Sequence, residues 1–267
     1  MVKYLLSNWR QFKDKIRGKK IILLLDYDGT LCPIKRTPRL AVIPHDVKAL
    51  LEKLSGMLDC KLAIISGRSL EDIKNIIGIR GIIYSGNHGF EIEGPKIKFH
   101  GSIPYGYRRM LESIKRKLHK KFNGVKGAIL EDKEYSLGIH YRLASKSALS
   151  AIKKAFYEVV MVYLIKGKIK IRYGKKVFEV MPPNGWDKGK VVSWLLSRKF
   201  FSFGAKMAIP IYLGDDLTDE DAFQTLKNKG LTIFIGKPKM SSAKYYLRNV
   251  GQVKHFLKEI IKFLEGA

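Results

Sequence analysis

Two carboxylates separated by one residue come directly after a strongly apolar run near the start of the chain. Ile21 to Leu25 form an uninterrupted apolar stretch, which is typical of a fully buried strand. Asp26 and Asp28 follow it, and Gly29 allows the chain to turn there. Because ligands of open α/β sheets bind at the carboxyl ends of strands, this placement predicts a metal-assisted reaction centre.

The segments around these acids alternate between strand and helix patterns. The expected elements of residues 21–90 are strands 21–25, 61–65 and 82–84, a helix over 46–58 and another that begins at Ser69. Strands separated by helices predict right-handed βαβ units in a doubly wound parallel α/β sheet, Rossmann-like in form. The same rhythm resumes later, with helices 188–198, 219–228 and 252–264 and strands 208–213 and 231–235.

The middle of the chain has a different rhythm. The patterns predict helices over 107–122 and 147–163 and strands at 125–131, 135–142, 168–173 and 176–181. This αββαββ order favours a separate α+β layer with four antiparallel strands and two helices. We therefore expect a catalytic core of residues 1–103 plus 182–267, interrupted by a cap domain of residues 104–181.

The composition is that of a globular protein with an unusual charge. The 267 residues are 46% hydrophobic, which excludes a disordered chain, and the formal net charge is +27. Residues 104–181 hold 19 Lys and Arg against 6 Asp and Glu, a net of +13. Such an excess favours anionic partners, although a Lys-rich thermophile surface would give the same numbers. Many of these cations cluster on the helix predicted over 107–122, the basic helix. This helix shows no aromatic stacking pattern of the kind that single-strand binders use, so nucleic acid is an unfavoured partner.

Other features bound the cellular setting. Cys32 and Cys60 have no metal-ligand or redox spacing, and a reducing cytoplasm is the default location. No apolar stretch is long enough to span a bilayer and the N-terminus lacks a signal pattern, so we expect no membrane partner. The sequence does not distinguish a monomer from an oligomer.

Several short motifs occur in a characteristic order. They are Asp26-Tyr-Asp-Gly-Thr-Leu31, Ser66-Gly-Arg68, Gly86-Asn-His-Gly-Phe-Glu91, Lys188 and Gly214-Asp-Asp-Leu-Thr-Asp-Glu-Asp221. With these motifs the chain resembles the trehalose-6-phosphate phosphatases of the haloacid dehalogenase superfamily over nearly its whole length. The resemblance implies a phosphomonoester hydrolase that uses Mg²⁺ and acts on a sugar phosphate.

The resemblance also implies roles for the core residues. Asp26 would be the nucleophile and a metal ligand, with the main-chain carbonyl of Asp28 and the carboxylate of Asp215 as further ligands. Asp28 would also protonate the leaving sugar oxygen and then deprotonate the attacking water. Ser66, which follows a predicted strand, would donate a hydrogen bond to the phosphoryl group, although Ser66 could instead be an ordinary helix-start serine.

Lys188 lies at a predicted helix start, where a cation is mildly unfavourable, and this local cost favours a functional charge. By resemblance it neutralises the phosphoryl group and holds Asp26. Asp216 and Asp219 are expected to orient metal-bound water or to pair with Lys188.

Substrate recognition is expected from the cap. Glu131-Asp-Lys133-Glu-Tyr-Ser136 followed by His140-Tyr-Arg142 resembles the cap motif of the family, and Glu179 lies in a second such segment. Met181 departs from the family pattern, which often has arginine there. The candidate substrate-binding residues are Arg68, Asn87, His88, Glu131, Lys133, Ser136, Arg142 and Glu179; the cap acids and lysine could equally be charges on a solvated sheet.

The motifs together with this resemblance imply Mg²⁺-dependent hydrolysis of trehalose 6-phosphate through an aspartyl-phosphate. Three alternatives remain open. The chain could act on another sugar phosphate, such as sucrose phosphate or mannosyl-3-phosphoglycerate, it could be a non-catalytic sugar-phosphate sensor, or it could bind nucleic acid through its basic helix.

Overall fold

The computed structural model describes residues 2–199, 201, 203, 207–238 and 240–266. It divides into two compact units, which we describe separately: the core unit, residues 1–99 with 186–267, and the inserted unit, residues 100–185. The chain leaves and re-enters the core unit once, so the inserted unit is continuous in sequence.

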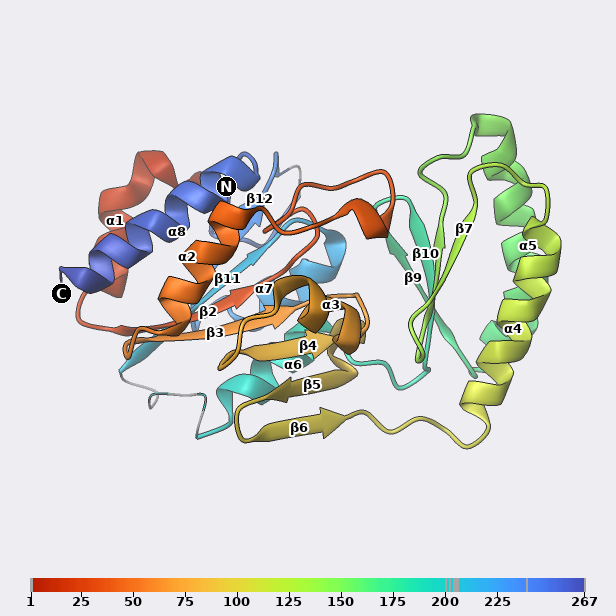
Figure 1. Cartoon of the computed structure of the whole chain (residues 1–267), viewed down its shortest axis with the longest axis horizontal. Coiled ribbons are helices and arrows are strands. Elements are labelled where there is room, and N and C mark those ends of the chain that lie inside the picture. Colours follow the sequence, from red (N-terminus) through yellow and green to blue (C-terminus); the bar gives the residue numbers. More distant parts are fainter. Residues whose placement is uncertain (1, 200, 202, 204–206, 239, 267) are drawn as a thin grey trace. The chain divides into compact units, whose positions relative to one another are not determined.

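A large mixed sheet forms the centre of the core unit (Figure 1). Its strand order is β1 (Lys3–Tyr4), β13 (Tyr245–Leu247), β12 (Leu231–Ile235), β11 (Ala208–Gly214), β2 (Lys20–Leu25), β3 (Cys60–Ile65), β4 (Ile83–Gly86), β5 (Glu91–Gly94) and β6 (Ile97–His100). In this sheet order, every strand from β1 across to β4 is parallel to its neighbour, which confirms the predicted parallel sheet. Strand β5 is antiparallel to β4. The chain runs outward from β2 through β3 and β4 and returns on the other side of β2 as β11. The junction of β2 and β11 is therefore the topological switch point, where such sheets bind ligands.

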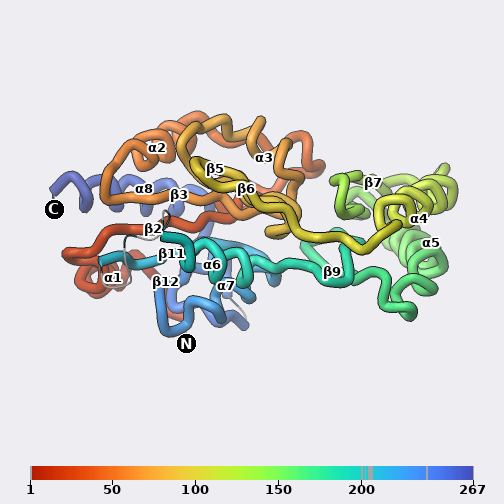
Figure 2. Tube along the Cα trace, turned by 90° about the horizontal axis from the view of Figure 1, so that it is seen from below, coloured from red at the N-terminus to blue at the C-terminus, as the bar shows by residue number. Residues whose placement is uncertain are grey.

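The central strands are apolar throughout because helices cover both faces of the sheet. Leu23 and Leu25 of β2 pack into one core cluster with α1 (Trp9–Ile16), α2 (His45–Ser55), α3 (Leu70–Ile77) and α8 (Val250–Glu265). Ile22 and Leu24 pack on the opposite face with α6 (Lys188–Leu196) and α7 (Glu220–Thr225). Figure 2 shows the strands between α2 and α3 on one side and α6 and α7 on the other.

The inserted unit has the predicted α+β layer. Its antiparallel sheet has the order β7 (Ile129–Asp132), β8 (Leu137–His140), β10 (Val177–Met181) and β9 (Lys170–Gly174). The helices α4 (Tyr107–Phe122) and α5 (Lys146–Ile165) pack side by side on one face, as Figure 1 shows, around a shared apolar cluster. Side chains that alternate with this cluster occupy the other face, which is the polar one.

Some expected bounds were wrong. The helix predicted over 46–58 ends at Ser55, Gly56 caps it, and Leu58 is 92% exposed instead of lying on the buried face. The helix predicted over 219–228 is a short 3-10 turn, Leu217–Asp219, followed by α7, which ends at Thr225. The short strands β1, β5, β6 and β13 had no clear sequence signal, because strands of two to four residues are too short for periodicity to reveal.

Candidate active site

The acids of the first and last motifs meet at the switch point of the core sheet. Strands β2 and β11 pair in parallel, and the Asp26 amide donates to the Leu213 carbonyl at 2.9 Å. Asp26 and Asp215 therefore leave their strands at the same edge. One carboxylate oxygen from each of Asp26, Asp215 and Asp219 lies within 4.8 Å of the others, and all three residues are buried. A group of buried acids this close requires neutralisation.

Asp26 has one carboxylate oxygen engaged and one unpaired. Its Oδ1 accepts from Lys188 Nζ at 2.6 Å, whereas Oδ2 is buried and accepts no hydrogen bond. Burial, reinforced by Asp219 and Asp215, raises the pKa of Asp26 well above its ordinary value, although Lys188 opposes the shift. A buried anionic oxygen without a partner is costly unless the site binds something there.

Asp219 is engaged on both oxygens. Its Oδ1 accepts from Lys188 Nζ and from the Tyr212 hydroxyl, each at 2.7 Å, and its Oδ2 accepts from the backbone N–H groups of Asp215 and Asp216, each at 2.9 Å. This carboxylate holds Lys188 and shapes the 214–219 turn. Burial alone lowers the pKa of Lys188, but Asp219 and Asp26 outweigh it and raise that pKa, so the ammonium stays charged.

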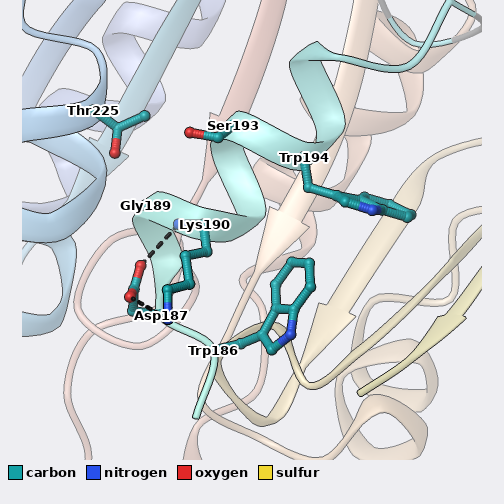
Figure 3. Close-up of a pocket in the computed structure, with 7 residues that line it drawn as sticks. All are labelled: Trp186, Asp187, Gly189, Lys190, Ser193, Trp194 and Thr225. Atoms are coloured by element: carbon teal, nitrogen blue, oxygen red, sulfur yellow. Dashed lines mark hydrogen bonds and ion pairs between the residues drawn. The ribbon is translucent and has the colours of Figure 1, made fainter. Parts of the chain in front are cut away.

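The start of α6 is built to fix Lys188. Asp187 caps the helix by accepting from the Lys190 N–H at 2.8 Å, as Figure 3 shows. Gly189 lets α6 approach α7, because a Cβ there would lie 2.5 Å from the Asp221 carbonyl oxygen. Trp186 precedes α6 and Trp194 lies within it. Their rings are 6.2 Å apart beside a cavity of about 560 Å³ (Figure 3).

The site fits a divalent metal ion. Asp26, Asp215 and Asp219 would carry three negative charges and Lys188 one positive charge, which leaves two negative charges for a divalent cation to balance. Carboxylate oxygens are the ligands that Mg²⁺ prefers. Gly29, at φ +93°, lets the Asp215 carboxylate lie directly against the turn after Asp28, since a Cβ on Gly29 would lie 1.8 Å from Asp215 Oδ2. Because both oxygens of Asp219 already accept hydrogen bonds, Asp26 and Asp215 are the candidate ligands among these three acids.

The second and third motifs lie at the ends of the neighbouring strands β3 and β4. Ser66 is buried, and its Oγ accepts from the Arg68 N–H at 3.1 Å, which leaves the hydroxyl proton to be donated elsewhere. Arg68 itself contacts Asp28 through two hydrogen bonds, Nε to Oδ2 at 2.7 Å and Nη2 to Oδ1 at 2.9 Å. Asp28 is half-exposed whereas Arg68 is buried.

The loop after β4 closes against the Ser66 loop. Asn87 and His88 both have positive φ, 48° and 56°, a strained conformation for these residues. The N–H of His88 donates to the Ser66 carbonyl at 3.0 Å, and the Asn87 side chain donates to Glu91 at 2.7 Å. Strain held in place by such contacts is common at functional sites.

The polar face of the inserted sheet brings most of the predicted sugar-binding residues together. Lys133 donates to Glu179 at 2.7 Å, Ser136 donates to the same oxygen at 3.3 Å, and Glu131 contacts His140 at 2.6 Å. Burial raises the pKa of Glu131, but Lys133 and His140 outweigh it and lower that pKa, so Glu131 is a carboxylate.

Glu131, Gly138 and Glu179 are neighbours across three strands of this sheet. A Cβ on Gly138 would lie 3.2 Å from Glu131 Oε2 and from His140 Nε2. The missing side chain of Gly138 lets the Glu131 and His140 side chains pack closely over the backbone of β8.

Other residues differ from expectation or had no strong signal. Arg142 lies exposed and donates to the Lys175 carbonyl at 2.7 Å, so the structure does not show it in contact with the Glu131–Glu179 group. Two residues were not among the predicted site residues. Arg172 lies opposite Glu179 on the neighbouring strand, and the Tyr212 hydroxyl donates to Asp219. Arg172 looks like any strand arginine and Tyr212 like a core residue, so only the sheet pairing and the hydrogen bond identify them. His140, by contrast, lies in a recognisable motif.

Comparison with known proteins assigns the family. The family model described as trehalose-phosphatase matches residues 24–250. The chain belongs to the trehalose-phosphatase family. This confirms the resemblance seen in the motifs.

Curated relatives of this trehalose-phosphatase family chain carry matching names. A probable trehalose-phosphate phosphatase 4 of Oryza sativa is 33% identical over 97% of this chain and 70% of its own length. Trehalose-phosphate phosphatase B of Arabidopsis thaliana is 30% identical over 97% of this chain and 71% of its own length. The family is thus one of phosphatase enzymes.

Solved structures share the fold of this family member. The C-terminal domain of a C. albicans trehalose-6-phosphate phosphatase aligns with a TM-score of 0.84 at 22% identity, over 98% of this chain and 99% of that one. The C-terminal domain of a Candida albicans trehalose synthase regulatory protein aligns at 0.70 and 16% identity, over 96% and 99%. Fold alone therefore does not separate an enzyme from a regulatory domain. Among the described residues, helices that could cross a membrane are absent.

Proposed function

We propose that this chain hydrolyses trehalose 6-phosphate to trehalose and phosphate, with Mg²⁺ as its metal and a phosphorylated Asp26 as the intermediate. The observation that carries the proposal is the unpaired, buried Oδ2 of Asp26 beside Lys188. A purely regulatory domain would have no need to bury a reactive carboxylate at this cost.

The chain's own residues account for the steps. Asp26 attacks phosphorus, and the bond from phosphorus to the sugar oxygen breaks while Asp28 gives that oxygen a proton. Asp28 then takes a proton from water, whose oxygen attacks phosphorus and releases Asp26. Lys188 and Ser66 supply a positive charge and a hydrogen bond to the phosphoryl oxygens throughout.

The metal would be held by Asp26 and Asp215, with the main-chain carbonyl of Asp28 as a further candidate ligand. When bound, Mg²⁺ would reduce the repulsion between the carboxylate and the phosphate dianion. Asp216 and Asp219 support this turn through hydrogen bonds to its backbone.

We further propose that the inserted unit recognises the disaccharide through its polar face. Charged and hydroxyl groups gather on both sides of Gly138 and can bond sugar hydroxyls: Glu131, Lys133, Ser136 and Glu179, joined by His140. Asn87 and His88 are assigned to the phosphate side of the substrate, and a role for Arg142 stays a prediction.

The test is phosphate release from trehalose 6-phosphate and from a panel with sucrose 6-phosphate, mannosyl-3-phosphoglycerate and glucose 6-phosphate. We expect activity with Mg²⁺ and none after chelation, and a loss of at least about 1000-fold in Asp26→Asn. A preference for another sugar by about tenfold or more in kcat/KM would replace the substrate, and chelator-resistant activity would exclude the metal.

A further inference from the structure

The guanidinium of Arg68 is almost wholly engaged within the core unit. Besides its two bonds to Asp28, Nη1 donates to Asp72 Oδ2 at 2.7 Å and Nη2 donates to the Pro38 carbonyl at 2.9 Å. These contacts use four of the five N–H donors of an arginine. Arg68 is also packed over the Tyr27 ring, with Cζ 5.2 Å from its centroid. A side chain held from four directions has little freedom to contact a substrate.

The partner in this contact remains accessible. The Asp28 side chain is 42% exposed, whereas that of Arg68 is 6% exposed. Each carboxylate oxygen has two acceptor sites, and Arg68 occupies one on each oxygen, so a second acceptor site on each oxygen is still open. The guanidinium fork therefore fixes the plane of the carboxylate without covering it, which is the particular strength of a bidentate arginine.

We propose that Arg68 is a positioning residue for the acid and base Asp28, and that it does not itself bind the substrate. This inference rests on the proposed function, because it requires Asp28 to transfer protons. When Asp28 gives its proton to the leaving oxygen, it becomes a carboxylate whose new charge Arg68 is already placed to stabilise. The same fork then holds that carboxylate toward the water from which the proton is recovered.

Two further contacts make the arrangement rigid. Asp72 lies on the first turn of α3, so its bond to Nη1 ties Arg68 to a helix whose N-cap is Ser69. The Pro38 carbonyl belongs to the segment 33–42 after the nucleophile turn, and the Tyr27 hydroxyl fixes the same segment through the Ala41 carbonyl at 2.7 Å. Arg68 is thus held by α3 on one side and by the 33–42 segment on the other.

The test compares two phosphate esters in the same variants. Hydrolysis of trehalose 6-phosphate releases an alkoxide-like oxygen that needs a proton, whereas p-nitrophenyl phosphate releases a phenolate that does not. The ratio kcat/KM reports the steps up to loss of the leaving group. For Arg68→Met we expect kcat/KM to fall about 100-fold for trehalose 6-phosphate and less than about fivefold for p-nitrophenyl phosphate.

Matched variants separate this role from others. Asp28→Asn should show the same selectivity with a larger loss, and the exposed Arg80→Met, on the same βαβ unit, should change neither substrate. If Arg68→Met does not fold, as judged by circular dichroism and thermal unfolding, Asp72→Asn carries the test, because its side chain is 44% exposed and it loosens only one side of Arg68. We expect about a tenfold loss there, again confined to the sugar phosphate.

Other outcomes overturn the inference. Equal losses on both esters would assign Arg68 to the phosphoryl group or to the fold, and a higher KM with unchanged kcat would assign it to the sugar. Unchanged activity in Arg68→Met would show that Asp28 needs no such support. If the wild-type protein cleaves p-nitrophenyl phosphate but not trehalose 6-phosphate, only the substrate assignment fails, and the comparison is repeated with the best alkyl phosphate of the panel.

Discussion

At the scale of single residues, the site places a destabilising charge where chemistry requires one. Asp26 is buried and has one unpaired oxygen, and its pKa lies above the ordinary value of 3.8 in the folded chain. The folded protein therefore holds the proton of the Asp26 carboxyl group more tightly than the unfolded chain does. The stability that Asp26 contributes is full below about pH 3.8 and is lost as the pH rises through its higher folded value.

It follows that Asp26→Asn should stabilise the metal-free protein at neutral pH. The neutral amide avoids the cost of an ionised, buried group, which is about 1.4 kcal/mol for each unit by which the pKa is displaced. Lys188 keeps its bond to Asp219 in the variant, so it is not left unpaired. The measurement is thermal unfolding in chelator at a series of pH values, where the variant's advantage should grow from about pH 3.8 up to the higher folded pKa of Asp26.

The same variant provides the control with metal. Mg²⁺ should raise the unfolding temperature of the wild-type protein and have a smaller effect on Asp26→Asn, because a ligand stabilises only the state that binds it. A variant that is less stable than the wild type in chelator at neutral pH would show that the pair with Lys188 outweighs burial.

Residue types alone do not assign separate roles to the three acids of the last motif. Asp215, Asp216 and Asp219 occur in one short run, and the sequence predicts only that some bind metal and others support it. The division depends on which carboxylate faces backbone N–H groups. Asp219 accepts from two such groups and from Tyr212, a contact between side chains that only the folded chain brings together.

At the scale of elements, the loops after β3 and β4 fit together through one glycine. A Cβ on Gly67 would lie 2.6 Å from two atoms of the His88 ring, Cε1 and Nε2. Gly67 separates Ser66 from Arg68, so the approach of the ring helps to set the position of both. The glycine is needed for space and not for a left-handed conformation, since its φ lies outside the positive range.

We therefore expect Gly67→Ala to lower stability by about 1–3 kcal/mol, the usual cost of overpacking, and to reduce activity. His88→Gly removes the obstructing ring and tolerates the positive φ at that position. In the double variant Gly67→Ala/His88→Gly, the added methyl group should cost less than about 0.5 kcal/mol relative to His88→Gly alone. Urea unfolding of the four proteins gives the coupling energy.

Additive effects in this cycle would contradict the proposed fit between the two loops. Gly78→Ala is an unsuitable control because of its left-handed backbone, whereas Gly56, with φ −84°, offers a matched glycine-to-alanine change in the same unit. Gly56→Ala should be close to neutral, since its Cβ would meet nothing nearer than 3.6 Å.

The elements that hold the site could largely be predicted from the sequence, and the contacts between their loops could not. Strand β2 is a continuous apolar run because helices cover both its faces, and α4 has a clear helical stripe of buried residues. The loops 66–68 and 86–91 have no periodicity, and their fit depends on strand order. Arg68 shows the difference, because its motif suggested substrate binding and its contacts with Asp28 and Asp72 became visible only in three dimensions.

At the scale of the whole molecule, positive charge is unevenly distributed along the chain. The inserted unit has about a third of the residues and carries +13 of the total +27. Several cations on α4 are paired in the structure, among them Arg108 with Glu134 and Lys121 with Glu158. Arg116 and Lys120 on the same helix are exposed, and the ion pairs that the described residues make do not include them. A surface of this kind can attract an anionic substrate over several ångströms or serve only for stability.

If the basic surface attracts the substrate, kcat/KM should depend on salt, and that dependence should change when cations of the inserted unit are replaced. At fixed Mg²⁺, kcat/KM for trehalose 6-phosphate should fall several-fold between about 20 and 500 mM salt, because the Debye length shortens from roughly 20 to 4 Å. Inhibition by trehalose, which has no charge, should not change. Replacing Arg116 and Lys120 by Glu should lower kcat/KM at low salt and flatten its salt dependence. The matched control replaces two exposed cations of the core unit, Arg10 and Lys258, by Glu. Because both double variants change the net charge by the same amount, an equal effect would show that only total charge matters. No effect in either variant would leave the basic surface with a role in stability, which thermal unfolding of the same variants would measure.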